Sequence, residues 1–348
     1  MKSKNLNLNT VTGRAKYFQK HAQKEIEEIK EYLDSKTFVG FLLAKKSAGK
    51  GTYSKMFQEV IGQDRVVTIS IGDLVRETHA KLDENPNNIK ELINKLVPNY
   101  RGYISLEDSL KAFLDRNQST LIPSEFILAL IKEKLSEFPD KAVFIDGFPR
   151  GMDQITYALY FRQIMNLRPD PDFFVLINVP ETIIEERIKT RVICPTCNTA
   201  RNMKLLPSEF ADYNKKTKEI FLICDNVDCA GYKKQAMVKK DGDELGLEPI
   251  RNRIKNDAEL IKQALQLHGI PKVILNNSIP VKDKEKYKEY EITPEFVHKV
   301  DEANKKVKVI EKPWIVKDDE GNDSYSLLAA PVVLSMIKQI HSILFSTD

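Results

Sequence analysis

The sequence predicts an α/β protein whose core is a parallel sheet of five strands flanked by helices. Five short runs rich in β-branched and aromatic residues are almost continuously apolar, as strands buried on both faces are. They are residues 37–44, 65–71, 141–146, 172–179 and 272–275. Helical stretches such as 125–135 and 181–191 separate these runs. This alternation is typical of a parallel sheet wrapped by helices.

The composition indicates a globular protein. The 348 residues are 42% apolar and 30% charged, which is ordinary for a chain with a packed core. The formal net charge of +4 is too small to indicate a nucleic-acid partner. Residues 1–10 hold no apolar stretch, and the apolar run 324–337 is interrupted by Pro331 and is too short to span a bilayer. We therefore expect a cytoplasmic protein, with no nucleic-acid or membrane partner, and a monomer.

Two segments lie outside the alternating core. Residues 1–36 predict a charged helix that packs on the domain surface, because its apolar residues recur on one face. These residues are Phe18, Ala22, Ile26, Ile29 and Leu33. In the tail, residues 282–291 carry eight charges in ten residues, which indicates a solvated face. Residues 312–316 and 323–328 flank the turn DDEGN and predict a hairpin, followed by a helix over 329–345.

The first predicted strand runs into AKKSAGKGT, residues 44–52, before a predicted helix. Backbone N–H groups and a helix N-terminus at such a turn can surround a phosphate, and Lys50 adds a positive charge. Thr52, just inside the helix, can face Mg²⁺. The segment departs from G-x-x-x-x-G-K-[ST] in two ways. Ala44 stands in place of the first glycine, and Gly51 follows Lys50, so that the hydroxyl residue, Thr52, comes one position later. A lysine-rich surface turn therefore stays open as the alternative.

All four cysteines fall within residues 194–229, as two close pairs. In a cytosolic chain such pairs indicate metal ligands before disulfides. Four thiolates, from Cys194, Cys197, Cys224 and Cys229, suit tetrahedral Zn²⁺. The second pair has four intervening residues, so Asp228 or another neighbour could replace Cys229 as the fourth ligand. Four unligated thiols and an iron–sulfur cluster are the alternatives.

Four further motifs occur in order along the chain: ISIGDLVRE (69–77), LIPSE (121–125), DGFPR (146–150) followed by Gln154, and ERIKTR (186–191). Together with the phosphate loop they resemble the adenylate kinase family of nucleoside monophosphate kinases over residues 37–280. The resemblance implies a P-loop NTPase-like fold, with a helical insertion that binds the nucleoside monophosphate (NMP) at 77–121 and a zinc-bound lid at 192–248. Residues 1–36 then form an N-terminal helical extension, and 281–348 form a C-terminal extension of unknown role.

The resemblance also implies roles for individual residues. The ATP site would comprise Ser47, Ala48, Gly49, Lys50, Gly51, Thr52 and Arg187, the last stacking on the donor base. The NMP site would comprise Ile71, Arg76, Ile122, Gly147, Arg150 and Gln154. The catalytic groups would be Lys50, Asp146, Arg150, Arg191, Lys239 and Arg253, with Asp146 holding the waters of Mg²⁺. Lys239 stands where the family has an arginine, and a lysine keeps the charge but loses the two-point grip on phosphate.

These residues predict reversible transfer of the ATP γ-phosphoryl group to AMP, giving two ADP. Catalysis would rest on positioning and on neutralising charge. Ile71 stands where AMP-specific members usually have threonine, so a UMP/CMP kinase is an alternative. Ala44 and Ser47 replace loop glycines, so a catalytically weak pseudo-kinase is another. A zinc-ribbon nucleic-acid binder is disfavoured, because the basic residues of the lid are interleaved with acidic ones and few aromatics accompany them.

Overall fold

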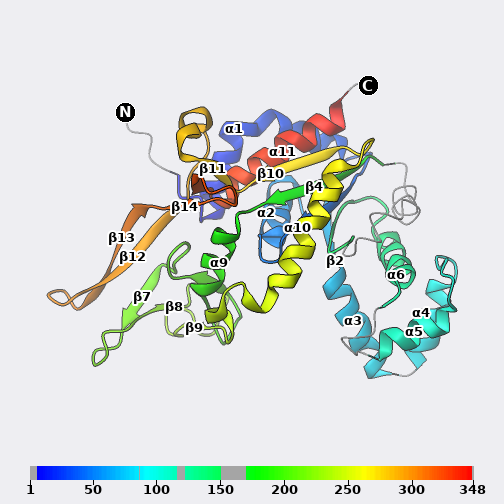
Figure 1. Ribbon diagram of the computed structural model, residues 1–348, viewed down its shortest axis with the longest axis horizontal. Coiled ribbons are helices and arrows are strands. Elements are labelled where there is room, and N and C mark those ends of the chain that lie inside the picture. The colour runs from blue at the N-terminus through cyan, green and yellow to red at the C-terminus, as the bar shows by residue number, and fades with distance from the viewer. Residues whose placement is uncertain (1–5, 86, 116–121, 150–169, 347–348) are drawn as a thin grey trace.

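The computed structural model describes residues 6–85, 87–115, 122–149 and 170–346. Its centre is a parallel five-stranded sheet in the order β10-β4-β1-β3-β2 (Figure 1). The strands are β1 (Val39–Ala44), β2 (Val66–Ser70), β3 (Ala142–Asp146), β4 (Asp172–Asn178) and β10 (Lys272–Asn276). Each coincides with one of the five predicted runs, so the α/β class and the parallel sheet are confirmed.

Helices cover both faces of the sheet because successive side chains of a strand point to opposite sides. In β1, Phe41 and Leu43 face one hydrophobic cluster, and Leu42 and Ala44 face the other. The first cluster is completed by α6 (Ser124–Ser136) and α10 (Arg251–Gln266). The second is completed by α1 (Val11–Tyr32), α2 (Lys50–Ile61), α9 (Glu181–Lys189) and α11 (Ala329–Phe345).

The two terminal helices lie side by side on the second face (Figure 1). The predicted apolar face of α1 is buried there, and Phe18 and Ile29 are at most 1% exposed. The helix predicted over 329–345 is confirmed as α11. A contact of 2.5 Å between His341 Nε2 and Glu28 Oε2 joins the two helices. The terminal segments therefore share the central core.

A helical lobe follows β2 and lies at one end of the molecule (Figure 1). Its helices are α3 (Ile71–Glu84), α4 (Asn87–Leu96) and α5 (Leu106–Leu114), and they pack on α6. Leu96, Phe113 and Phe126 are each at most 1% exposed in their cluster. This lobe has a core of its own, which matches the helical excursion expected from the sequence.

The lid segment, residues 192–248, is built from short strands and turns. Its elements are β5 (Arg191–Ile193), β6 (Ala200–Asn202), β7 (Phe210–Tyr213), β8 (Ile220–Ile223), β9 (Val238–Lys239) and the 3₁₀ helix η1 (Asp243–Leu245), with η2 (Glu248–Ile250) leading into α10. Strands β6-β5-β9 form one small sheet, and β7 pairs with β8 as a hairpin. Its buried cluster has six members, and three of them are cysteines.

The C-terminal segment, residues 281–346, adds two hairpins before α11. The predicted hairpin is confirmed as β14 (Ile315–Lys317) with β15 (Asp323–Ser326), which also pairs with β11 (Ser278–Pro280). The other hairpin, β12 (Pro294–Asp301) with β13 (Lys306–Pro313), follows the 3₁₀ helix η3 (Val281–Tyr287) and was not predicted.

The unpredicted hairpin β12–β13 lies against the lid segment (Figure 1). The N–H of Phe296 donates to the carbonyl of Lys204 at 2.7 Å, and Lys218 Nζ lies 2.9 Å from Glu302 Oε1.

Among the described residues, none of the helices combines the length and the apolar character needed to cross a membrane.

Candidate active site and cysteine cluster

The phosphate loop connects the end of β1 to the start of α2. Ala44 remains in the strand, paired with Ile177 of β4, so its methyl group sits on ordinary extended backbone. The turn itself uses left-handed backbone at two residues, Ser47 with φ 66° and Gly49 with φ 104°. Glycine adopts this conformation freely, whereas an L-residue such as Ser47 pays a steric cost. The loop therefore turns with serine in a position that favours glycine.

Lys50 lies at the carboxyl end of the sheet. Its Nζ is 3.6 Å from Asp146 Oδ1 and donates to the carbonyl of Ala44 at 3.3 Å. Asp146 ends β3, the strand that pairs with β1. The parallel register therefore brings the predicted lysine and carboxylate together at one edge of the sheet, where ligands of open α/β sheets bind.

A cavity of about 470 Å³ opens above this edge. Its other wall is formed by Arg187 and Ile188 of α9 and by Arg191 at the start of β5. The complete lining is Ser47, Ala48, Gly49, Lys50, Gly51, Thr52, Lys55, Asp146, Arg187, Ile188 and Arg191. The structure thus brings together the loop, Asp146 and two of the predicted arginines. Lys55, which sequence reasoning missed, follows Gly51 by four positions and Thr52 by three on α2, and that helical spacing was the available signal.

The two arginines of this wall, Arg187 of α9 and Arg191 of β5, are each held by a partner from a distant segment. Arg191 makes a bidentate pair with Asp243 of η1, with Nε–Oδ2 at 2.7 Å and Nη2–Oδ1 at 2.6 Å. The Nη2 of Arg187 donates to Asn277 Oδ1 at 2.8 Å. Neither Asp243 nor Asn277 was predicted as part of the site.

Positive charge gathers around the loop beyond the cavity lining. Burial lowers the pKa of Lys46 below its usual range, and the nearby cations of Arg253, Lys240 and Arg191 lower it further. The backbone N–H of Lys46 donates to Asp257 at 2.8 Å. Lys240, the neighbour of the predicted Lys239, is thus a lysine of this segment whose charge acts on Lys46; the role of Lys239 stays a prediction. A concentration of cations at this end of the sheet favours a polyanionic ligand.

Other predicted residues lie away from this cavity. Within the described part of the chain, Arg76, Lys239 and Arg253 are not in its lining. Arg76 is exposed on α3 and pairs with Asp73, and Lys239 is exposed on β9, opposite Val192 of β5. Arg253 is half-exposed near Asp257 on α10.

The predicted acceptor-side residues have different surroundings. Ile71 is only 2% exposed and belongs to the hydrophobic core, while Ile122 packs on the cluster of the helical lobe. Gly147 follows β3 with φ 93°, a conformation that favours glycine. Arg150 and Gln154 lie outside the described residues. Their predicted roles, like that of Ile71, stay predictions.

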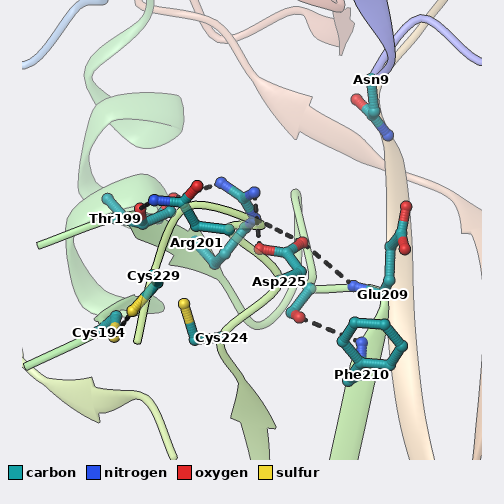
Figure 2. Close-up of polar contacts among 12 residues, drawn as sticks. Asn9, Cys194, Thr199, Arg201, Glu209, Phe210, Cys224, Asp225 and Cys229 are labelled. Carbon is teal, nitrogen blue, oxygen red and sulfur yellow. Dashed lines mark hydrogen bonds and ion pairs between the residues drawn. The ribbon is translucent and has the colours of Figure 1, made fainter. Parts of the chain in front are cut away.

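The four cysteines form one cluster between β5, β8 and the turns that follow them (Figure 2). Their sulfur atoms all lie within 4.8 Å of one another. The Cys194–Cys229 and Cys197–Cys224 sulfur distances are 3.9 and 3.7 Å. A tetrahedral ion with metal–sulfur bonds of about 2.3 Å has sulfur–sulfur edges of about 3.8 Å. Cys229 is thus grouped with the other three, which favours it over Asp228 as the fourth ligand.

The chemistry of the cluster also fits a cation. A hydrogen bond with Thr199 lowers the pKa of Cys197 to about 6, and the N–H of Gly231 donates to Cys229 Sγ at 3.3 Å. Burial raises the pKa of Cys224 to about 12, so a dication beside it is needed to hold it as a thiolate at neutral pH. The four cysteines can therefore hold a metal ion.

A buried ion pair supports the cluster from outside. Arg201 of β6 faces Asp225, which follows Cys224 (Figure 2), and the closest approach is 2.7 Å. Asp225 Oδ2 also accepts from the N–H of Glu209 at 3.3 Å. Because the Asp225 side chain is only 8% exposed, this pair fixes the turn that carries Cys224. Arg201 and Asp225 were not singled out from the sequence.

No family model matches the chain. Among curated proteins, the chain is 29% identical over 229 residues to the adenylate kinase of Thermotoga neapolitana, covering 65% of this chain and 83% of that relative. It is 28% identical over 214 residues to that of Thermotoga maritima, covering 61% and 77%. It is 31% identical over 165 residues to that of Kosmotoga olearia, covering 47% and 63%. The parallel sheet, the phosphate loop and these relatives together support assigning the chain to the adenylate kinase family, and they indicate a phosphotransferase.

Proposed function

We propose that this protein is a nucleoside monophosphate kinase that transfers the γ-phosphoryl group of ATP to AMP. The observation that carries the proposal is the cavity at the sheet edge, which the loop, Lys50 and Asp146 line together with Arg187 of α9 and Arg191 of β5. Such a cavity offers the backbone N–H groups of a helix N-terminus and several cations. It suits phosphoryl transfer, in which positioning and charge neutralisation do most of the work.

Each wall of the cavity would have a separate task. The backbone of residues 47–52 and Lys50 would hold the ATP phosphates, and Arg187 would hold the donor base. Arg191 would neutralise charge on the transferring group, with Arg253 and Lys240 close enough to add to the potential. The acceptor phosphate would itself attack, so the protein must align two nucleotides and exclude water.

Thr52 and Asp146 are the oxygen-bearing side chains of the lining suited to Mg²⁺ and its waters. When bound with ATP, the ion would neutralise part of the phosphate charge. Asp146, whose Oδ1 lies 3.6 Å from Lys50 Nζ, would hold those waters.

AMP is the proposed acceptor on account of Gln154, whose amide can both donate to and accept from an adenine edge. Ile71 is the residue that keeps UMP and CMP as alternatives. The test is a coupled assay of ADP release with ATP-Mg and each of AMP, UMP, CMP and GMP. We expect the highest kcat/KM with AMP. A higher value with UMP or CMP would contradict the choice of acceptor, and no transfer to any of the four would favour the pseudo-kinase.

We further propose that the cysteine cluster holds one structural Zn²⁺. The sulfur spacing supports a tetrahedral ion, and four thiolates with no open position favour zinc in a structural role. Elemental analysis of the purified protein should give about one zinc per chain, by the four-ligand argument. Iron in its place would indicate the iron–sulfur alternative, and absence of metal would leave four thiols.

A further inference from the structure

Asn277, between β10 and β11, is fully buried and contacts Arg187, a residue that lines the ATP cavity. Its Oδ1 accepts from Arg187 Nη2 at 2.8 Å and from Ser326 Oγ at 3.2 Å. Its Nδ2 donates to the hydroxyl of Tyr53 at 2.9 Å and to the carbonyl of Leu327 at 3.2 Å. The whole hydrogen-bonding capacity of the amide is used, which fixes its orientation.

These four contacts join three elements that the chain places far apart. Arg187 comes from α9, Tyr53 from the first turn of α2 after the phosphate loop, and Ser326 from β15 of the C-terminal segment. The backbone adds to the connection, because the N–H of Leu327 donates to the carbonyl of Asn277 at 2.8 Å. The C-terminal segment, through Ser326 and Leu327, therefore fixes Asn277, which in turn holds the Arg187 guanidinium.

A second contact from the same segment reaches the phosphate loop. Asp319, in the turn between β14 and β15, lies 2.5 Å from Lys45 Nζ. Asp319 Oδ1 also accepts from the N–H of Glu181 at 2.7 Å, at the start of α9. The hydroxyl of Thr182 donates to the carbonyl of Lys317 at 2.6 Å. The turn thus holds the loop and the N-terminus of α9 in one arrangement.

Lys45 is a largely buried cation that is paired with carboxylates. Its side chain is only 9% exposed, and its charge is met by Asp319 and, at 3.5 Å, by Glu181. A buried cation is costly unless a carboxylate compensates it. Removing Asp319 would therefore leave Lys45 with weaker compensation and release the loop that it belongs to.

We propose that the C-terminal segment is a positioning element of the ATP site, acting at two points. Ser326, through the buried Asn277 just before the segment, positions Arg187 at the end of the cavity that would take the donor base, and Asp319 through Lys45 positions the phosphate loop. These are positioning residues, since they touch Arg187 and Lys45 rather than the nucleotide. The inference rests on the proposed function only in taking ATP as the ligand of this cavity.

The two points can be separated with two ligands, a non-hydrolysable ATP analogue and inorganic tripolyphosphate, both with Mg²⁺, in calorimetric titrations of the full chain. Asn277→Ala should weaken binding of the ATP analogue about tenfold, as loss of a hydrogen bond to a charged group does. It should leave tripolyphosphate, which has no base, within about twofold. Asp319→Asn should weaken both ligands by a similar factor of about five to ten.

Matched control variants test whether a loss of affinity comes from the position of the substituted residue rather than from substitution as such. Asn276→Ala removes the exposed neighbour of Asn277, and Asp323→Asn removes an exposed carboxylate of the same hairpin that pairs with Lys317. Both should bind both ligands like the wild type. The double variant Lys45→Met with Asp319→Asn should bind tripolyphosphate more tightly than Asp319→Asn alone, because it removes the buried cation together with its partner.

If Asn277→Ala does not fold, Ser326→Ala provides the test, because it removes one hydrogen bond and leaves Asn277 and Arg187 in place. It should weaken the ATP analogue by about two- to threefold with tripolyphosphate unchanged. Folded variants with a lower melting temperature but wild-type affinities would overturn the proposal. So would Asn277→Ala or Ser326→Ala weakening both ligands equally. A wild type that binds no ATP analogue would overturn the proposed function itself, and this inference with it.

Discussion

The sheet edge and the lid segment place their functional groups by different means. Strands β1, β3 and β4 are buried between two large clusters, so Lys50 and Asp146 are held by a core that does not depend on them. The lid cluster has only Val192, Leu222 and Met237 as buried apolar residues besides its cysteines. So small a core supplies little folding free energy. The lid therefore depends on the residues of its own candidate metal site.

This contrast predicts which property each kind of substitution changes. A change at the sheet edge should alter the chemistry and leave the fold intact, because the side chains there lie at the surface of a core that other residues build. A change among the cysteines should alter the local fold first. Stability within one protein is uneven in this way when regions open separately.

The largest effect is expected from Lys50→Met, which removes the cation nearest to Asp146. It should lower kcat by roughly a hundredfold or more, as loss of a main transition-state charge does, and leave the melting temperature close to that of the wild type. Steady-state kinetics and circular dichroism measure the two. Lys24→Met, at a lysine with 80% of its side chain exposed on α1, is the control and should change neither. A large fall in the melting temperature of Lys50→Met would contradict the contrast between the sheet edge and the lid segment.

Cys229→Ser is expected to act on the lid alone. It removes one of four ligands, so zinc content should fall and the backbone amides of β5 to β9 should exchange with solvent faster, while those of β1, β3 and β4 keep their protection. Hydrogen exchange followed by mass spectrometry resolves the two regions. Ser208→Ala in the same segment keeps all four thiols and should retain its zinc. Equal loss of protection in the sheet would show that the lid is part of one cooperative unit.

Ala44→Gly is expected to have a modest effect. Because Ala44 lies in β1 on extended backbone, glycine is not required there, and kcat should change by less than about tenfold, a difference near 1.4 kcal/mol in barrier height. The measurement is kcat with ATP-Mg and AMP. If the wild type is inactive and Ala44→Gly restores phosphoryl transfer, the result would instead favour the pseudo-kinase. It would show that the Ala44 methyl group prevents the loop from supporting transfer.

The smallest effect concerns Ser47, which has φ 66° in the loop. Ser47→Gly should raise the free energy of unfolding by about 1 kcal/mol or less, since glycine adopts left-handed backbone without the steric cost but loses more entropy on folding. Denaturant titration measures this, and Ser47→Ala should show no gain. A destabilised Ser47→Gly would mean that the serine side chain stabilises the turn by an amount that exceeds its strain.

Local patterns in the sequence determined much of this protein. The five strands and the terminal helices followed from hydrophobic periodicity, which the backbone converts directly into buried faces. The turn at Ser47–Thr52 and the two cysteine pairs could be located because their functional groups are close in the chain. The helix over 329–345 and the hairpin before it were found for the same reason.

Only the tertiary structure decided how distant segments meet around the cavity. Lys45 and Asp319 are 274 positions apart, and Arg187 and Asn277 are 90 apart. The sequence offers many carboxylates and amides at such distances, and a residue type alone does not indicate its partner. The hairpin β12–β13 escaped prediction because its strands are polar and half-exposed, and charged alternating stretches pair as strands only where cross-strand and neighbouring contacts stabilise them. All these pairings depend on the packing of the whole chain, and the contacts of Lys45 with Asp319 and of Arg187 with Asn277 hold two walls of the cavity in place.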